Sequence, residues 1–223
     1  MARLLTFLLV LVLGSNLALA APVLYENGTF TGNKNALRFN NGLQVSDSFL
    51  LGSAGTIDSI VFSTWTNVAT PTTQLDWIIS TQDATAGFGT VLAQASNQLI
   101  TSSFLFNNGP THGNFNVWSN SFQLGSPLSL AAGTYFLTFF NGVTPGSAFA
   151  LWDESGGPSQ VTQQDSLNVY PVTSAQSNYF AIQAPAAAGA PELNAGQALL
   201  PAVMALLLLG LSSGRRPAAG ARA

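Results

Sequence analysis

Two adjacent carboxylates are the residues of this chain best suited to binding a metal ion. Asp153 and Glu154 stand in the stretch "LWDESGGPS", where two glycines give the backbone freedom to present its carbonyl groups. Calcium takes carboxylate, amide and carbonyl oxygens from such loops. The stretch therefore raises the hypothesis of a Ca²⁺ site at Asp153 and Glu154. The alternative interpretation is a solvated turn that follows the strand ending near Trp152.

Catalytic chemistry has few residues to use. The chain contains no cysteine and one histidine, His112, in the loop sequence "NGPTHGN". Nucleophilic catalysis needs a nucleophile beside a base, and a zinc site needs several His or Cys ligands. Glycoside hydrolysis needs only two carboxylates. Asp153 and Glu154 point to opposite faces of an extended strand, so a partner would be a distant acid such as Asp58 or Asp76. We expect no catalytic residue, with a carbohydrate-active enzyme as the alternative.

Tryptophans offer a second kind of chemistry. Trp65, Trp77, Trp118 and Trp152 each lie in or beside an expected strand. Packing in the core is one interpretation of all four. The other is that one or two of them are exposed and stack on sugar rings, and Trp152 and Trp118 are the candidates for this ligand-binding role.

Short alternating apolar segments, separated by Gly, Asn and Pro, must position these residues. Strands are expected at 56–65, 75–80, 90–96, 99–106, 114–124 and 134–142, and again near 147–152 and 178–183. No segment between residues 21 and 190 shows a convincing helical period. The pattern predicts an all-β fold, an antiparallel β-sandwich of jelly-roll type. An up-and-down barrel is the alternative arrangement.

Charge excludes one class of partner. Residues 21–190 contain two basic residues, Lys34 and Arg38, and eight acidic ones, which gives 2 − 8 = −6. Such a surface is not built to collect phosphates, so we expect no nucleic acid. Without cysteine, no disulfide can form, and the fold must rest on its hydrophobic core.

The first 20 residues have the pattern of a signal peptide. Arg3 precedes the apolar run "LLTFLLVLVLG", and Ala18 and Ala20 form a small-residue cleavage signature before Ala21. We therefore expect export through the Sec translocon and cleavage by signal peptidase after Ala20.

The other end of the chain has an ordered set of features. An Ala/Pro-rich linker leads to Pro191, Glu192 and Leu193, and an apolar stretch is followed by Arg215 and Arg216. The stretch is close to the length of a membrane span, and the arginines would hold their end in the cytoplasm. The expected divisions are a signal peptide (1–20), a β-sandwich ectodomain (21–184), a linker with the Pro-Glu pair (185–197), a transmembrane helix (198–214) and a cytoplasmic tail (215–223).

This tail resembles the C-terminal sorting signal of PEP-CTERM proteins of Gram-negative bacteria. Pro191, Glu192, the apolar stretch and Arg215–Arg216 match that signal, whereas Leu193 departs from its third motif position. The body looks like the β-rich ectodomain of some such proteins, through "VSDSFLL", "TIDSIVFSTW", "LDWIIS", "LAAGTYFLTFFNG" and "LWDESGGPS". The resemblance implies recognition by an exosortase-like membrane protease and an association with exopolysaccharide. The alternative is a plain membrane-anchored surface protein.

The resulting expectation is an exported bacterial surface or matrix protein. Its β-sandwich would be non-catalytic, with a structural or adhesive role that includes binding exopolysaccharide.

Overall fold

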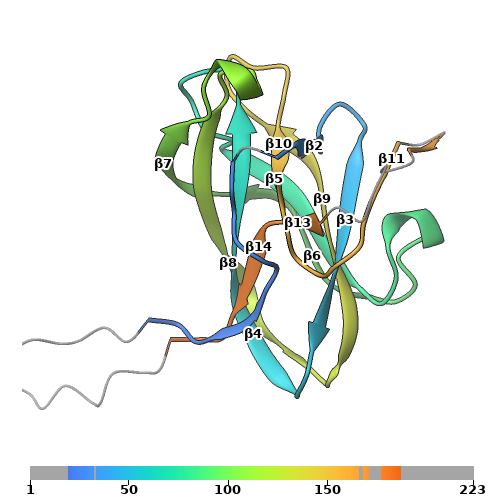
Figure 1. Ribbon diagram of the computed structural model, residues 1–223. Coiled ribbons are helices and arrows are strands. Elements are labelled where there is room, and N and C mark those ends of the chain that lie inside the picture. Colours follow the sequence, from blue (N-terminus) through green and yellow to red (C-terminus); the bar gives the residue numbers. More distant parts are fainter. Residues whose placement is uncertain (1–19, 33, 166–167, 171–176, 187–223) are drawn as a thin grey trace, which may run out of the picture. The chain divides into compact units, whose positions relative to one another are not determined.

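The computed structural model describes residues 20–32, 34–165, 168–170 and 177–186. Residues 21–186 form one compact unit. The described residues are almost entirely β-strands in two sheets, so the all-β prediction is confirmed (Figure 1). No helix in the described ranges is long and apolar enough to cross a membrane.

The larger sheet has eight strands. β4 and β8 form its centre, and β7 lies outside β8. On its other side β4 pairs with two strands, β14 and β10. β14 pairs in turn with β1, and β10 pairs with β2 and β13. The pairings are antiparallel throughout. The strands are β1 (Val23–Glu26), β2 (Ala36–Arg38), β4 (Gly55–Thr66), β7 (Thr101–Asn107), β8 (Asn116–Leu130), β10 (Leu151–Ser155), β13 (Ser177–Asn178) and β14 (Phe180–Gln183).

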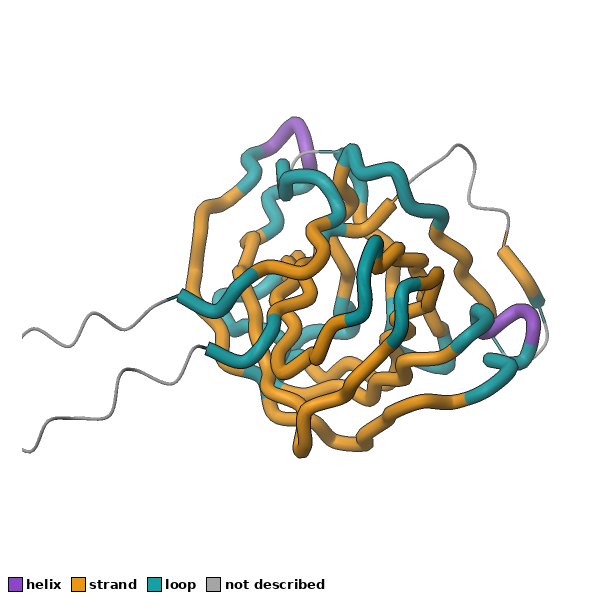
Figure 2. Tube along the Cα trace, turned by 90° about the horizontal axis from the view of Figure 1, so that it is seen from below, coloured by secondary structure: helices purple, strands orange, loops and turns teal. Residues whose placement is uncertain are grey.

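The smaller sheet has six strands in the order β12-β11-β3-β9-β5-β6, also antiparallel. They are β3 (Gln44–Leu51), β5 (Gln74–Ser80), β6 (Val91–Leu99), β9 (Gly133–Val143), β11 (Val161–Gln164) and β12 (Val169–Tyr170). Two short 3₁₀ turns, η1 (Ala84–Ala86) and η2 (Pro110–His112), complete the described elements (Figure 2).

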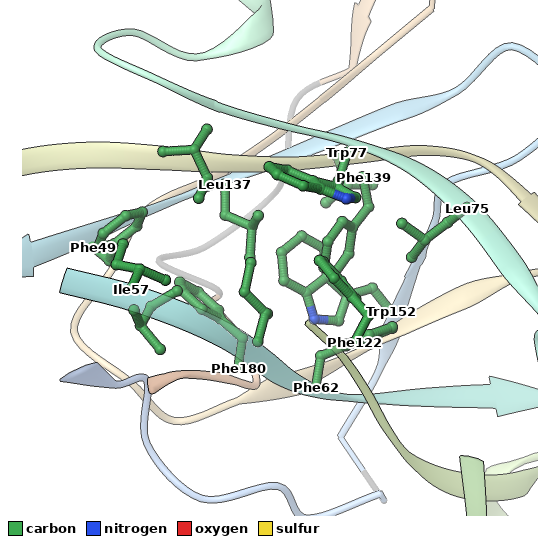
Figure 3. Packing of buried hydrophobic residues seen from close by; sticks show 14 of the residues in the cluster. Phe49, Ile57, Phe62, Leu75, Trp77, Phe122, Leu137, Phe139, Trp152 and Phe180 are labelled. Carbon is green, nitrogen blue, oxygen red and sulfur yellow. The ribbon is translucent and has the colours of Figure 1, made fainter. Parts of the chain in front are cut away.

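Side chains from both sheets form one hydrophobic cluster. In β9, Leu137 and Phe139 are fully buried, as their period-two spacing predicts. Phe139 lies with its ring centre 4.7 Å from that of Phe62 in β4 and 4.3 Å from that of Trp152 in β10 (Figure 3). One aromatic side chain of the smaller sheet therefore contacts two strands of the larger one.

β8 runs further than the sequence suggested. The expected strand stops at Gly125, whereas β8 continues to Leu130 and contains Pro127. The pairing with β4 jumps from Ser59↔Gln123 to Ile57↔Leu128, which leaves residues 124–127 as a wide bulge opposite Asp58. A proline, which cannot donate a backbone hydrogen bond, is tolerated in such a bulge.

Candidate functional site

Asp153 lies in β10 and is fully buried, with hydrogen-bond donors on both of its oxygens. Its Oδ2 accepts from the Ser63 hydroxyl (2.8 Å) and the Gly32 N–H (3.3 Å), and its Oδ1 accepts from Trp65 Nε1 (2.7 Å). Burial raises the pKa of Asp153 to about 6, although these donors act in the opposite direction. The carboxyl group thus ties β10 to β4 and to the segment before β2.

Glu154 lies on the opposite face of the same strand, as adjacent residues of a strand must. Burial raises its pKa to about 7, and the hydrogen bond from Asn35 and the charge of Lys34 act against that shift. Among the described residues, no group of three or more His, Cys, Asp or Glu side chains could hold a metal ion. The Ca²⁺ site at Asp153 and Glu154 stays a prediction, and calcium there would have to displace donors from Asp153.

A third buried acid, Asp47, was not singled out from the sequence. It occupies a core-facing position of β3, between Val45 and Phe49. Its Oδ2 accepts from the backbone N–H of Asn178 and from Asn27 Nδ2, while none of the described residues donates a hydrogen bond to its Oδ1. Burial raises the pKa of Asp47 to about 7. The signal in the sequence was an acid at a position that the period-two pattern of "QVSDSFLL" assigns to the core.

The two candidate tryptophans have different surroundings. Trp152 is fully buried and packs against Phe139 and Phe180, and its Nε1 donates to the Tyr179 carbonyl at 2.8 Å (Figure 3). A side chain packed in this way presents no ring face to a polysaccharide. This corrects the candidate role of Trp152, because its position in β10 points it toward the other sheet. Trp118 in β8 is only partly buried.

Trp118 forms an aromatic pair with Phe104, which lies directly opposite on β7. The rings meet edge to face with their centres 5.3 Å apart, and Phe104 is 53% exposed. Trp118 Nε1 donates to the hydroxyl of Thr66 at 2.9 Å, which fixes the orientation of the indole ring. The pair offers a ligand an apolar surface that is held in place from the β4 side.

Two amide side chains extend this surface. Asn116 lies two residues before Trp118 and so on the same face of β8. It accepts from Asn107 Nδ2 at 3.0 Å, and its own Nδ2 donates to the Val68 carbonyl at 2.8 Å. A bulge between Phe104 and Phe106 brings Asn107 opposite Asn116. We call Phe104, Asn107, Asn116 and Trp118 the aromatic–amide patch.

A cavity of about 530 Å³ lies apart from the patch and is lined by residues of the larger sheet, by the end of β6, and by Ala21 and Ala186 at the two ends of the body. Its lining includes Ser59, Gln123, Gln183, Gln98 and Leu99. Its lining is rich in amides and hydroxyls, and Asp58 is the one carboxylate among the lining residues. Canonical glycoside hydrolysis needs a second carboxyl group across the scissile bond, which this cavity does not provide.

No protein-family model matches the chain, and no curated protein matches it in sequence. The sorting residues Pro191, Glu192, Leu193, Arg215 and Arg216 lie outside the described residues, as does Ala18 of the cleavage signature. Ala20 and Ala21 are described, and β1 begins at Val23.

Proposed function

We propose that this chain is an exported bacterial surface or matrix protein whose body binds polysaccharide through the aromatic–amide patch. The observation that carries the proposal is the exposed Phe104 ring beside the half-buried Trp118, with neutral amides on the same face. Aromatic rings supply apolar contact area, and amides supply both donors and acceptors for hydroxyl groups. We propose a non-catalytic role, in adhesion or matrix structure.

The shared hydrophobic cluster supports a sandwich arrangement of jelly-roll type for the body, because both sheets contribute buried side chains to it. Trp118 lies on the same, core-facing side of β8 as Phe122, four residues further along the strand, so the patch continues the inner face of the larger sheet toward one end.

A neutral polysaccharide is the expected ligand class. The patch contains no charged residue, while residues 21–190 carry a net charge of 2 − 8 = −6. An acidic polymer would be repelled by that charge at low ionic strength. We therefore expect binding to neutral glycans that changes little with salt.

The two ends of the body support surface display. β1 and β14 are antiparallel neighbours, and Ala184 N–H donates to the Pro22 carbonyl at 2.8 Å. The chain thus enters and leaves the body at one place, drawn at the lower left in Figure 1, whereas η2 beside the patch is drawn at the top. Both connections of the body to the flanking segments therefore leave from one place, which suits display of the body on a tether.

Calorimetric titration of the purified full chain in detergent with a panel of neutral polysaccharides tests the binding proposal. Phe104→Ala should weaken binding about tenfold, the loss expected for one aromatic contact. Phe30→Ala is the matched control, because Phe30 also forms an edge-to-face pair, with Tyr179 at 5.4 Å, and is 37% exposed. Equal losses for both variants, or no binding to any glycan, would contradict the proposal. Release of new sugar ends would favour the carbohydrate-active enzyme instead.

Mass spectrometry of the mature protein from its producing cell tests the sorting proposal separately. Processing by an exosortase-like protease predicts a C-terminus near Pro191. A mature chain that retains Arg222 would indicate a plain membrane anchor.

A further inference from the structure

The outer strands of the two sheets differ sharply between the two flanks. On one flank the outer strands that the structure describes are short: β12 and β13 have two residues each, β2 has three and ends in Arg38, and β1 has four and ends in Glu26. On the other flank β6 has nine residues and β7 has seven. Natural sheets usually protect their edges with short strands and charged side chains, and only the first flank does so.

β6 and β7 lie at the same flank because the chain passes from one to the other through Ile100 alone. Each strand pairs on one side only among the described residues, β6 with β5 and β7 with β8. β6 is interrupted by bulges, with a positive φ of 54° at Asn97. β7 pairs in regular register from Thr101 to Phe104, so its free edge is the better template for another strand.

The strands β6 and β7 themselves contain no charged residue, and the nearby acids belong to other strands: Asp76 Oδ1 accepts from the Asn97 N–H, and Asp58 lines a cavity with Leu99 and Thr101. Between Asp83 and Asp153 the chain contains no Asp, Glu, Lys or Arg. The stretch "LITSSFLFN" at 99–107 combines β-branched and aromatic residues with no charge, Pro or Gly. Such stretches have a high tendency to pair with another strand when an edge leaves them exposed.

Charge also identifies the partner. All the charged residues of the segment 21–190 lie outside 84–152, with a net value of 2 − 8 = −6. Two copies of the chain repel each other through their net negative charge, and β7 adds no charged side chain of its own at its free edge. An antiparallel strand edge is complementary to itself about a two-fold axis.

We propose that two copies of this chain associate by antiparallel pairing of β7 with β7 of the second copy, through the free edge at Thr101–Asn107. This association goes beyond polysaccharide binding and does not depend on it. It would place two aromatic–amide patches in one assembly, where simultaneous contacts with a single polymer strengthen binding.

Sedimentation of the full chain in non-ionic detergent, without glycan, tests the association over about 1–100 µM, the range suited to a small interface. Ser103→Lys places like charges on the pairing strands and should raise the dissociation constant at least about tenfold. Thr134→Lys is the matched control, since Thr134 is an exposed residue of β9 in the other sheet, where it pairs with Leu50 of β3. It should change the constant less than about twofold. A monomer at every concentration, or equal effects of the two substitutions, would overturn the proposal.

A cross-linking measurement provides a second test, because the chain has no native cysteine. Ser103→Cys treated with a short bismaleimide should yield a covalent dimer, and Thr134→Cys should remain monomeric. Equal yields for the two variants would overturn β7 pairing. Association without glycan binding would overturn the patch proposal alone, so the two failures are distinguishable.

Discussion

At the scale of single residues, the interior of this protein contains acids that most cores exclude. Asp47 and Asp153 are fully buried, and Glu154 is 2% exposed. Asp153 is compensated by three donors, whereas Asp47 and Glu154 each keep one oxygen that accepts no hydrogen bond within the described part of the chain. Burying a carboxylate without enough donors favours its protonated form. Asp47 and Asp153 hydrogen-bond to segments that are distant in the sequence. The protonation of the three buried acids should therefore change the free energy of unfolding.

Stability should fall as pH rises from about 4 to about 7. The pKa of Asp47 is raised by burial to about 7 in the folded chain, so folded protein binds a proton that the unfolded chain has released. The stabilisation that comes from the protonated Asp47 carboxyl group is fully present below the pKa of this group in the unfolded chain. It is lost as pH rises through the pKa of the group in the folded chain. The free energy of unfolding by urea should be lower at pH 8 than at pH 4 by about 1–4 kcal/mol.

Asp47→Asn provides the check on this assignment. The amide cannot ionise, and its oxygen can still accept from Asn178 N–H. The variant should therefore lose a large part of the pH dependence. An unchanged slope between pH 4 and pH 8 would contradict the role of Asp47.

At the scale of elements, the sequence predicted several long strands well, but it missed β3 (Gln44–Leu51) and most of the short strands. The strands β4, β5 and β9 agree with 56–65, 75–80 and 134–142, because each alternates strongly and ends at turn residues. The stretch 99–106 was expected to be one strand, yet Ile100 separates β6 from β7 in different sheets. Such a change of sheet depends on tertiary packing and leaves no local signal.

The short strands and the candidate site could not be predicted from the sequence, because neither leaves a local sequence pattern. β2, β11 and β13 contain two to four residues each, too few to show a period. Trp118 could be named as a candidate from its type, but Phe104 became part of the site only through strand register. Trp152 could not be recognised as a core residue, because an exposed and a buried tryptophan have the same sequence signal.

The loop after β10 packs unusually closely against the segment after β1. A Cβ atom on Gly157 would overlap Asn27 Oδ1, whose amide group bonds to Asp47. Gly157→Ala should lower the free energy of unfolding by about 1–3 kcal/mol, the range for overpacking. Gly125→Ala is the matched control, since nothing lies within 4 Å of its Cβ. It should change stability by less than about 0.5 kcal/mol, and equal effects in urea unfolding would contradict the packing account.

At the scale of the whole molecule, the charge of the body is segregated along the sequence. The uncharged run between Asp83 and Asp153 includes β6, β7, β8 and β9, and the acids and both basic residues of the body lie outside it. The aromatic–amide patch and the free β7 edge both belong to this uncharged part. In the fold β6, β8 and β9 pair with strands that contain acids, and Asp76 of β5 accepts from the Asn97 N–H in β6 and from Asn141 Nδ2 in β9. Neutral polymer binding and self-association are therefore proposed for strands that themselves contain no charged residue.

The most direct measurement of polysaccharide binding uses the protein's own fluorescence. Of the four tryptophans, Trp65, Trp77 and Trp152 are at most 5% exposed, so a bound glycan should change the emission of Trp118 alone. Saturation with a neutral polysaccharide should shift the emission of the full chain to shorter wavelength, and Trp118→Phe should abolish the shift. A shift that persists in Trp118→Phe, or no shift with any glycan that binds, would contradict the aromatic–amide patch as the binding site.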